Sequence, residues 1–247
     1  SFASTTRLRA IAAAPGHIDS PETDQEYTIA LDEVEEDFYT MPFSAYTGGG
    51  DNLAVSGNTA FMNNSDGIIS VNITDPANPA IIGYYDEYSI QGLDANSNYL
   101  YAVRNGDLIQ FGISDPANLN YDQSYDTTSV DFHDIHVTEN HAYLAAEQPI
   151  HDTINGLHIF DLPLTFNPSP DYQSGIDTDP DHFTAEGVYY DGTYTYTVDS
   201  NSGGLNIIQT STNTWRNPSS NSGVGEDLVV YNGYAYVVNY NLDVYDV

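Results

Sequence analysis

Alternating apolar and polar positions recur along this chain in a unit of roughly 40 residues. Each copy begins with two alternating runs separated by a short turn of Gly, Asn or Ser, a pattern that predicts a β-hairpin. Five copies are present, and their predicted hairpins lie at residues 51–61, 91–101, 134–143, 186–196 and 227–236. Repetition of this kind predicts similar units that bury their apolar surfaces against one another.

A third apolar run follows each hairpin, at residues 68–73, 108–113, 157–162, 205–210 and 242–247. The first two of these runs lead into Asp75-Pro-Ala-Asn-Pro79 and Asp115-Pro-Ala-Asn118, where proline presets a turn and ends the strand. An outer strand is predicted next, at residues 80–85 in the first copy and 121–125 in the second. Four antiparallel strands per unit, repeated radially, predict an all-β fold, a five-bladed β-propeller.

The fifth copy lacks an outer strand, because the sequence ends at Val247 after the third. The segment Asp37-Phe-Tyr-Thr-Met-Pro-Phe43 has the spacing of an outer strand relative to the first hairpin, so we expect it to complete the fifth blade and close the ring. Residues 37–247 are then the propeller, and residues 1–36 are an extended N-terminal arm. The predicted blades span residues 51–86, 87–126, 127–175, 183–217 and 224–247, with 37–45 as the closing strand.

The repeat itself resembles that of a known family. Units reading Asp-x-x-Val-x-Gly-Asn-x-Ala-Tyr, an apolar strand and then Asp-Pro-Ala-Asn-Pro are similar to LVIVD-type repeats, found in β-propellers of secreted and surface-attached bacterial and archaeal proteins. Residues 51–79 match best, 91–118 and 227–247 match well, and 131–210 match in part. The resemblance implies a propeller and an extracellular or cell-surface location. It implies no reaction, because the activities of family members are mostly unknown.

The charge balance narrows the choice of partners. The chain has 36 acidic residues against four arginines and no lysine, giving a net charge of −32. Nucleic acid is excluded, because affinity for it comes from cations that meet phosphates. Two explanations of the acidity stay open: recruitment of divalent cations or cationic partners, and adaptation to salty water or general solubility. In either case, salt that screens self-repulsion is expected to stabilise the compact state.

Other features of the composition concern location. The chain has no cysteine, so no disulfide or thiol chemistry is available. No apolar run approaches the about 20 residues that a membrane-spanning helix needs. The sequence starts at Ser1 without an initiator Met, which indicates a processed, soluble product; whether it is part of a longer precursor stays open.

The predicted arm has features of an assembly element. Arg7 and Arg9 carry half of the positive charge, and Tyr27, Ile29 and Leu31 alternate as in a strand that could add to a sheet edge. A cationic arm on an anionic body predicts a homo-oligomer in which the arm docks on the next copy, forming rings or filaments. The alternative is an arm that folds back over its own propeller.

One set of polar residues recurs with the repeat. Asp51, Gln91, Asp134, Glu186 and Asp227 share a place at the start of the first strand, which in a propeller lies nearest the axis. The carboxylates of Asp51, Asp134, Glu186 and Asp227 are therefore candidate ligands of calcium, which prefers clusters of oxygen ligands. The alternative is that each carboxylate accepts hydrogen bonds from backbone amides of the adjacent loop.

No catalytic constellation is found, and we expect a protein that is not an enzyme. Six of the seven histidines fall in the third unit and its exit, but His133 and His136 are an odd number of residues apart on a strand and should face opposite ways, so they are not expected to share a metal ion. Asn63 and Asn72 begin glycosylation sequons. The 21 tyrosines are either blade-packing residues or a surface for a glycan or protein.

These observations together predict an extracellular structural or adhesive subunit that self-assembles through its N-terminal arm into a filament or surface array. The alternative is a monomeric secreted binding module that recognises a glycan, a peptide or a divalent cation.

Overall fold

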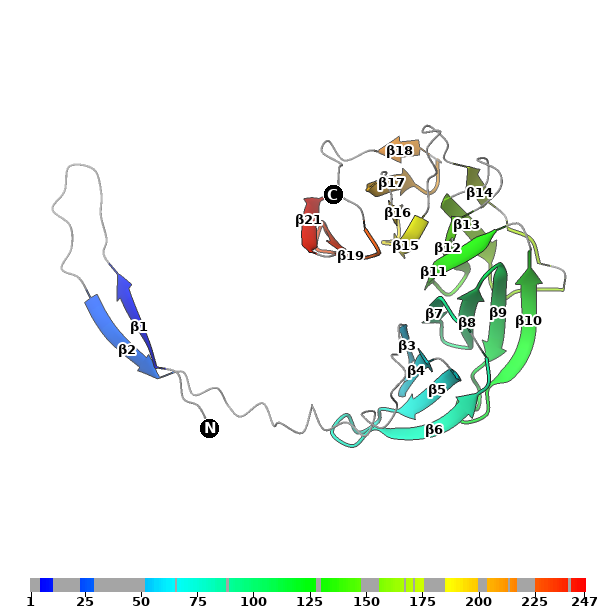
Figure 1. Ribbon diagram of the computed structural model, residues 1–247, viewed down its shortest axis with the longest axis horizontal. Coiled ribbons are helices and arrows are strands. Elements are labelled where there is room, and N and C mark those ends of the chain that lie inside the picture. Colours follow the sequence, from blue (N-terminus) through cyan, green and yellow to red (C-terminus); the bar gives the residue numbers. More distant parts are fainter. Residues whose placement is uncertain are drawn as a thin grey trace. The chain divides into compact units, whose positions relative to one another are not determined.

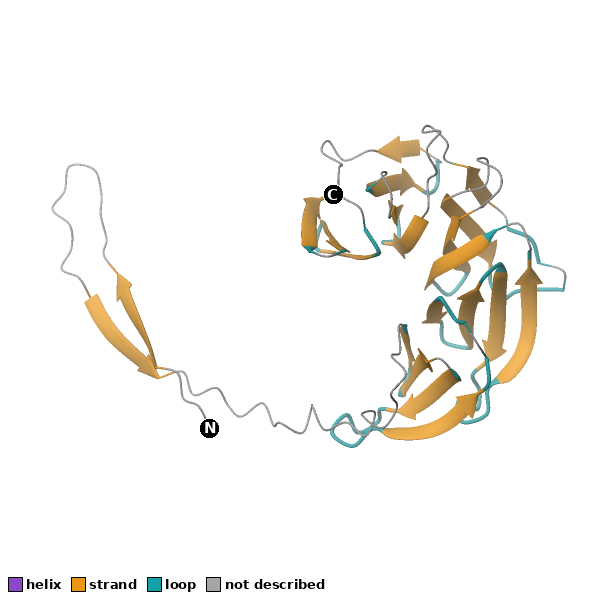
Figure 2. Ribbon diagram, in the orientation of Figure 1, coloured by secondary structure: helices purple, strands orange, loops and turns teal. Residues whose placement is uncertain are grey.

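The computed structural model contains only β-strands among the residues it describes, so the all-β prediction is confirmed for them (Figures 1 and 2). Contacts divide the chain into two compact units, Ser1–Thr47 and Gly48–Val247. No described residue belongs to a helix long and apolar enough to cross a bilayer. The described residues are 5–10, 23–28, 52–64, 66–87, 89–127, 130–147, 156–166, 168–170, 172–175, 185–199, 204–212, 214–216, 225–239 and 241–247.

The N-terminal unit contains one antiparallel hairpin, formed by β1 (Thr5–Ala10) and β2 (Thr23–Thr28). Its register places Arg7 opposite Glu26 and Arg9 opposite Asp24. Two residues of the segment predicted to add to another sheet edge, Tyr27 and Thr28, pair with Thr6 and Thr5 of the same chain. Ile29 and Leu31 lie outside the described residues.

The second unit contains five antiparallel sheets whose strands pair in chain order, one sheet per repeat. The first sheet comprises β3 (Leu53–Ser56), β4 (Thr59–Asn64), β5 (Gly67–Asn72) and β6 (Ala80–Tyr85). The second comprises β7 (Gly92–Ala95), β8 (Tyr99–Arg104), β9 (Asp107–Gly112) and β10 (Asn120–Asp126). The third comprises β11 (Asp131–Val137), β12 (His141–Glu147), β13 (Gly156–Asp161) and β14 (Tyr172–Gly175). The fourth comprises β15 (Ala185–Tyr190), β16 (Tyr194–Asp199), β17 (Leu205–Gln209) and β18 (Thr214–Arg216), and the fifth β19 (Asp227–Tyr231), β20 (Tyr234–Val238) and β21 (Leu242–Asp246).

The Asp-Pro-Ala-Asn segments form the turns between the third and fourth strands. In the first sheet, Asp75 Oδ1 accepts a hydrogen bond from Ala77 N at 3.1 Å, and Asp75 Oδ2 accepts one from Asn78 Nδ2 at 2.8 Å. The backbone closes the same turn, because Asn78 N donates to Asp75 O at 3.0 Å. Asp115 makes the equivalent bonds in the second sheet. This side-chain support explains why the turn sequence recurs with the repeat.

The five sheets follow one another as blades, since the first strand of each contacts the first strand of the next (Figure 1). A core lies between each pair of consecutive blades, because alternation along the strands gives every blade two apolar faces. Phe61 and Ile68 of the first blade pack with Leu93 of the second. The later cores repeat this arrangement with Leu108 and Ile135, with Leu157 and Val188, and with Leu205 and Leu228.

Ring closure is not part of what the structure describes. The fifth sheet has three strands, and no described strand pairs it with the first sheet. The segment predicted to close the ring, residues 37–45, lies outside the described residues. Five blades in sequence therefore agree with the prediction, whereas closure stays a prediction.

Candidate functional site

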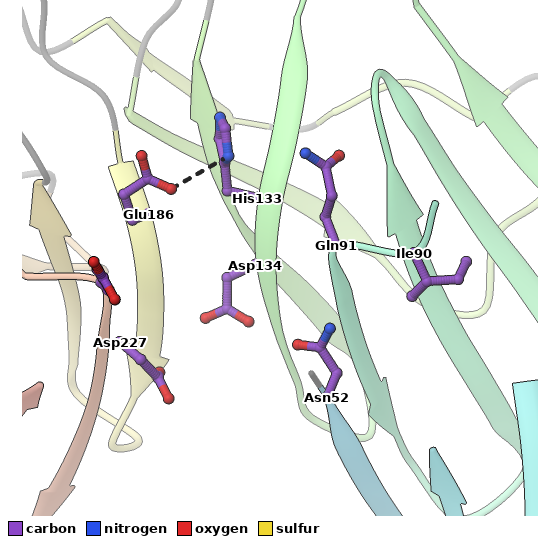
Figure 3. Close-up of a pocket in the computed structure, with 8 residues that line it drawn as sticks. Asn52, Ile90, Gln91, His133, Asp134, Glu186 and Asp227 are labelled. Carbon is purple, nitrogen blue, oxygen red and sulfur yellow. Dashed lines mark ion pairs between the residues drawn. The ribbon is translucent and has the colours of Figure 1, made fainter. Parts of the chain in front are cut away.

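A pocket of about 470 Å³ lies where the first strands of the blades begin (Figure 3). All five blades contribute to it. Its polar lining is acidic apart from one histidine and two amides, and no arginine of the described residues lines it. The lining residues are Asn52, Ile90, Gln91, His133, Asp134, Glu186, Glu226 and Asp227.

The strand register differs from the sequence alignment of the axial residues. In each blade, one apolar residue of the first strand pairs with the residue that follows the aromatic residue of the second strand. These apolar residues are equivalent to one another, and they are Leu53, Leu93, Ile135, Val188 and Leu228. The residues immediately before them in the chain are therefore also equivalent, and they are Asn52, Gly92, Asp134, Gly187 and Asp227. Glu186 and Gln91 fall one residue earlier, together with His133 and Glu226. Glu186 is thus not equivalent to Asp134 and Asp227.

Two β-bulges explain how the pocket acquires its ionisable pair. In β11 the register shifts between Phe132 and Asp134, which leaves His133 as the extra residue. In β15 it shifts between Ala185 and Gly187, which leaves Glu186 as the extra residue. Bulges re-aim side chains out of the regular alternation. Here the two extra residues meet, with His133 Nδ1 3.3 Å from Glu186 Oε2 (Figure 3).

A second carboxylate lies on the other side of this histidine. His133 Nε2 is 3.4 Å from Glu147 Oε2, at the end of β12. All three side chains are at least partly accessible, with 19% of His133, 26% of Glu186 and 35% of Glu147 exposed. Glu147 does not belong to the repeat pattern at the axis, so sequence alignment of the repeats could not identify it.

The first strands approach one another closely beside Asp134 and Asp227. A Cβ atom on Gly92 would lie 2.9 Å from Asp134 Cα, and one on Gly187 would lie 3.0 Å from Asp227 Cα. Glycine in the second and fourth blades therefore faces aspartate in the third and fifth. This close contact sets the spacing of the carboxylates around the pocket.

The aspartates near the axis are bonded to backbone amides. Asp134 Oδ2 accepts a hydrogen bond from Val188 N of the next blade at 2.9 Å, and Asp227 Oδ1 accepts one from Leu228 N at 2.7 Å. Asp94 in β7 does the same, accepting from Val137 N of the third blade at 2.6 Å. These amides belong to strands and not to the adjacent loops, so Asp134 and Asp94 each join two neighbouring blades.

Burial also changes the protonation of these groups. Loss of solvent raises the pKa of Asp134 to about 7, and the neighbouring Asp227 and Asp94 raise it further, against the lowering effect of the Val188 hydrogen bond. Loss of solvent likewise raises the pKa of Asp94 to about 6. Asp134 therefore titrates near neutral pH, inside the pocket.

A calcium site is not formed by the described residues. No three His, Asp or Glu side chains among them lie close enough together to hold one ion. Asp134, Glu186 and Asp227 belong to the described part of the chain, whereas Asp51 lies outside it. The calcium prediction would therefore need Asp51 or a rearrangement of the other three.

The histidines of the third unit have separate partners. The His136 ring lies 4.7 Å from that of Tyr189, and its Nδ1 is 4.0 Å from Asp94 Oδ2. Burial lowers the pKa of His136, so its neutral form is favoured. His133 contacts Glu147 and Glu186 instead.

The two sequons differ in accessibility. Asn63 is buried, and its Nδ2 donates a hydrogen bond to Ile90 O at 3.1 Å. Asn72 is exposed, and its Oδ1 accepts from Thr74 N at 2.8 Å. In the folded chain, only Asn72 of this pair presents a surface side chain.

The fold and pocket define a β-propeller repeat protein with an acidic axial pocket. Residues 47–87 and 90–127 match the LVIVD repeat family. Its first two blades therefore carry LVIVD repeats, as the resemblance of these units indicates. No curated protein matches its sequence.

Solved structures support the fold alone. The β-propeller domain of Myceliophteria thermophila Cps50 (Swd1) is 12% identical, with a TM-score of 0.57 over 77% of this chain and 67% of that one. A Bacteroides uniformis protein provisionally assigned as a 6-phosphogluconolactonase is 10% identical, with a TM-score of 0.60 over 78% of this chain and 65% of that one. Kuenenia stuttgartiensis hydrazine synthase is 12% identical, with a TM-score of 0.53 over 77% of this chain and 55% of that one. The chain thus spans about two thirds of the first two of these chains and about half of the third.

The titration of Asp134 leads to a prediction for Asp134→Asn. Between about pH 4 and pH 7 the folded state keeps a proton that the unfolded state has lost, so wild-type stability should fall as pH rises through this window. Asparagine keeps an acceptor for Val188 N and carries no charge. The variant should therefore match the wild type near pH 4 and exceed it by about 1–2 kcal/mol at pH 8, allowing for solvent screening. Urea unfolding across this range checks it, and parallel pH profiles for the two proteins would contradict it.

Proposed function

We propose that the propeller unit is a binding module that takes a cationic ligand in the axial pocket. The observation that carries this is the pocket itself, which gathers four carboxylates and, among the described residues, no arginine. Its volume of about 470 Å³ lies in the range of small-molecule sites. The ligand class is an organic cation with an ammonium or guanidinium group, since no described residues form a ready set of metal ligands.

The lining residues suggest separate roles in such binding. Asp227 and Glu226 are exposed at the start of β19 and would attract the cation. Glu186 is held by its bulge and by His133, so its carboxylate can accept a directed hydrogen bond from the ligand. A glycan fits less well, because none of the described phenylalanine, tyrosine or tryptophan residues lines the pocket.

Calorimetric titration tests this proposal with arginine amide, putrescine and calcium chloride as probes. Glu186→Gln and Asp227→Asn should each weaken binding of the organic cations by about tenfold, a loss of about 1.4 kcal/mol. Asp243→Asn in β21 is the matched control, because it removes one exposed carboxylate outside the pocket. Equal affinities for all three variants would mean that the probes respond only to net charge.

The second candidate is a structural or adhesive subunit that works outside the cell and assembles through its N-terminal segment. It is favoured by the separation of Ser1–Thr47 from the propeller as a compact unit. Electron microscopy of the full chain and of a chain lacking residues 1–36 tests it. Assemblies that disappear with the segment, while circular dichroism shows that the sheets are kept, would support the role. Identical images of the two proteins would remove it.

A further inference from the structure

One position of the repeat contributes a lining residue to the axial pocket from each of four blades. Its backbone is held alike in the second and fifth blades, because Gln91 N donates a hydrogen bond to Val103 O and Glu226 N donates one to Val238 O, each at 2.8 Å. The residues at this position are Gln91, His133, Glu186 and Glu226. Gln91 is the member of this set that has no ionisable group.

The pocket therefore has two unlike walls. The first and second blades supply an uncharged wall, which is made of Asn52, Ile90 and Gln91. The third, fourth and fifth blades supply the carboxylates. In Figure 3 the uncharged wall lies on one side of Asp134, and Glu186 and Asp227 lie on the other. A ligand that fills the pocket meets negative charge at one end only, so a cationic group alone does not account for the whole lining.

The orientation of the Gln91 side chain is fixed by a backbone group. Gln91 Oε1 accepts a hydrogen bond from Asn105 N at 2.6 Å. Since an amide nitrogen could not accept this bond, the contact determines which end of the side-chain amide faces Asn105. The nitrogen, Nε2, is therefore turned away from Asn105, and Figure 3 shows it on the side of His133. No described residue accepts a hydrogen bond from Nε2, so the uncharged wall presents two N–H donors to a ligand.

The turn that holds Gln91 is itself bonded to the next blade. Asn105 lies between β8 and β9 with a φ of 46°, in the left-handed region. Its carbonyl oxygen accepts a hydrogen bond from Phe132 N, at the residue before His133, at 3.2 Å. Asn105 therefore bonds to Gln91 through its N–H and to the third blade through its C=O. A donor held in this way loses little conformational freedom when a ligand binds, so its hydrogen bond contributes more to affinity.

We infer that the pocket selects an organic cation that also carries a neutral carbonyl group. The carbonyl accepts a hydrogen bond from Gln91 Nε2, and the ammonium or guanidinium group lies at the acidic wall beside Glu186 and Asp227. The amide of a basic amino acid has both groups. A carboxylate in place of the carbonyl is disfavoured, because it would face the four carboxylates of the pocket. The inference rests on the cation-binding function proposed above and names Gln91 as a residue that determines specificity within it.

Calorimetric titration of the full chain with three ligands tests the inference. Arginine amide and agmatine both carry an amino and a guanidinium group, and they differ only in the carboxamide. At about pH 6 the amino groups of both are protonated, so the two ligands have the same charge. Arginine amide should bind about fivefold more tightly than agmatine, the factor that one net hydrogen bond provides. Arginine, in which a carboxylate replaces the carboxamide, should bind more weakly than arginine amide.

Gln91→Glu separates recognition of the carbonyl from support of the turn. The variant keeps an oxygen that accepts from Asn105 N, and it replaces the two donors with a carboxylate. The added charge acts equally on both dications, so the ratio of their affinities should fall from about five to about one. A structural role of Gln91 would instead change both affinities together and leave the ratio as it is. Gln123→Glu is the matched control and should keep the ratio, because Gln123 lies in β10 and does not line the pocket.

Three results would overturn the inference while the cation-binding function stands. The first is a wild type that binds arginine amide and agmatine equally, and the second is a Gln91→Glu variant that keeps the wild-type ratio. The third is tighter binding of arginine than of arginine amide, because the preferred acceptor would then be charged. A wild type that binds none of the three ligands would instead reject the cation-binding function, and the inference with it.

Discussion

Gly92→Ala is expected to lower the free energy of unfolding by about 2–3 kcal/mol, although it adds a single methyl group. The added Cβ atom would lie 2.9 Å from Asp134 Cα and 3.0 Å from Ile135 N. Both are backbone atoms of the next blade, so the second and third blades would have to move apart. Denaturant titration at fixed ionic strength measures the loss.

Gly112→Ala is the matched control for this substitution. Gly112 also lies in a strand, β9, but the nearest atom to its added Cβ would be Asn120 O at 3.9 Å, an ordinary contact. Its unfolding free energy should stay within about 0.5 kcal/mol of the wild type. Equal losses in the two variants would show that inter-blade crowding is not the cause.

Phe132→Ala is expected to have a still larger effect, a loss of about 3–5 kcal/mol. Phe132 is fully buried, and its ring makes edge-to-face contacts with the rings of His158 and Phe160. The distances between ring centroids are 5.5 Å and 6.5 Å. The cavity left behind would lie directly beside the bulge that presents His133. Thermal unfolding measures the loss, and the histidine NMR signals should show a change at His133.

Phe166→Ala provides the control for the loss of an aromatic ring. Phe166 is 90% exposed, so its removal should change stability by less than about 0.5 kcal/mol. A Phe132→Ala protein that kept wild-type stability would mean that the core between the second and third blades is not as tightly packed as described.

Most strands of the fold could be predicted from local sequence patterns. The outer strand expected at residues 80–85 is β6, Ala80–Tyr85, and the third strands differ from their predicted bounds by one residue or so. These elements depend on alternation and on turn residues such as Asp75 and Asn78, which act within a few positions of one another. The N-terminal hairpin was not predicted, because its two strands are separated by 12 residues and do not belong to the repeat pattern.

The site was predicted only in part, because the alignment of the repeats was wrong by one residue in two blades. It gave Asp134 and Asp227 the same place as Gln91 and Glu186, whereas the strand register puts both aspartates one residue later. Counting back ten residues from Tyr143 and from Tyr196 instead gives His133 and Glu186, the pair that meets in the pocket. The sequence therefore contained that signal.

Other contacts around the site could not be predicted by aligning the repeats. Asp94 supports the pocket through Val137, 43 positions away, and Glu147 approaches His133 from the end of a second strand. Such contacts depend on how one blade packs on the next, which a single sequence does not record. The raised pKa of Asp134 has the same origin, because its main cause is burial between blades.

The two bulges have a consequence for how such a protein could be built or diversified. A chain made by duplicating the unit of residues 52–87 would be expected to keep the blades, since strands, turns and cores all follow from that unit. It would lack the pair of His133 and Glu186, because these two residues belong to β11 and β15, which the duplicated unit does not contain. Gln91 and Glu226 hold the same position in the second and fifth blades, so the chemistry of the pocket depends on the residue types at one position of the repeat, and substitution there in single blades would change the pocket on an unchanged framework.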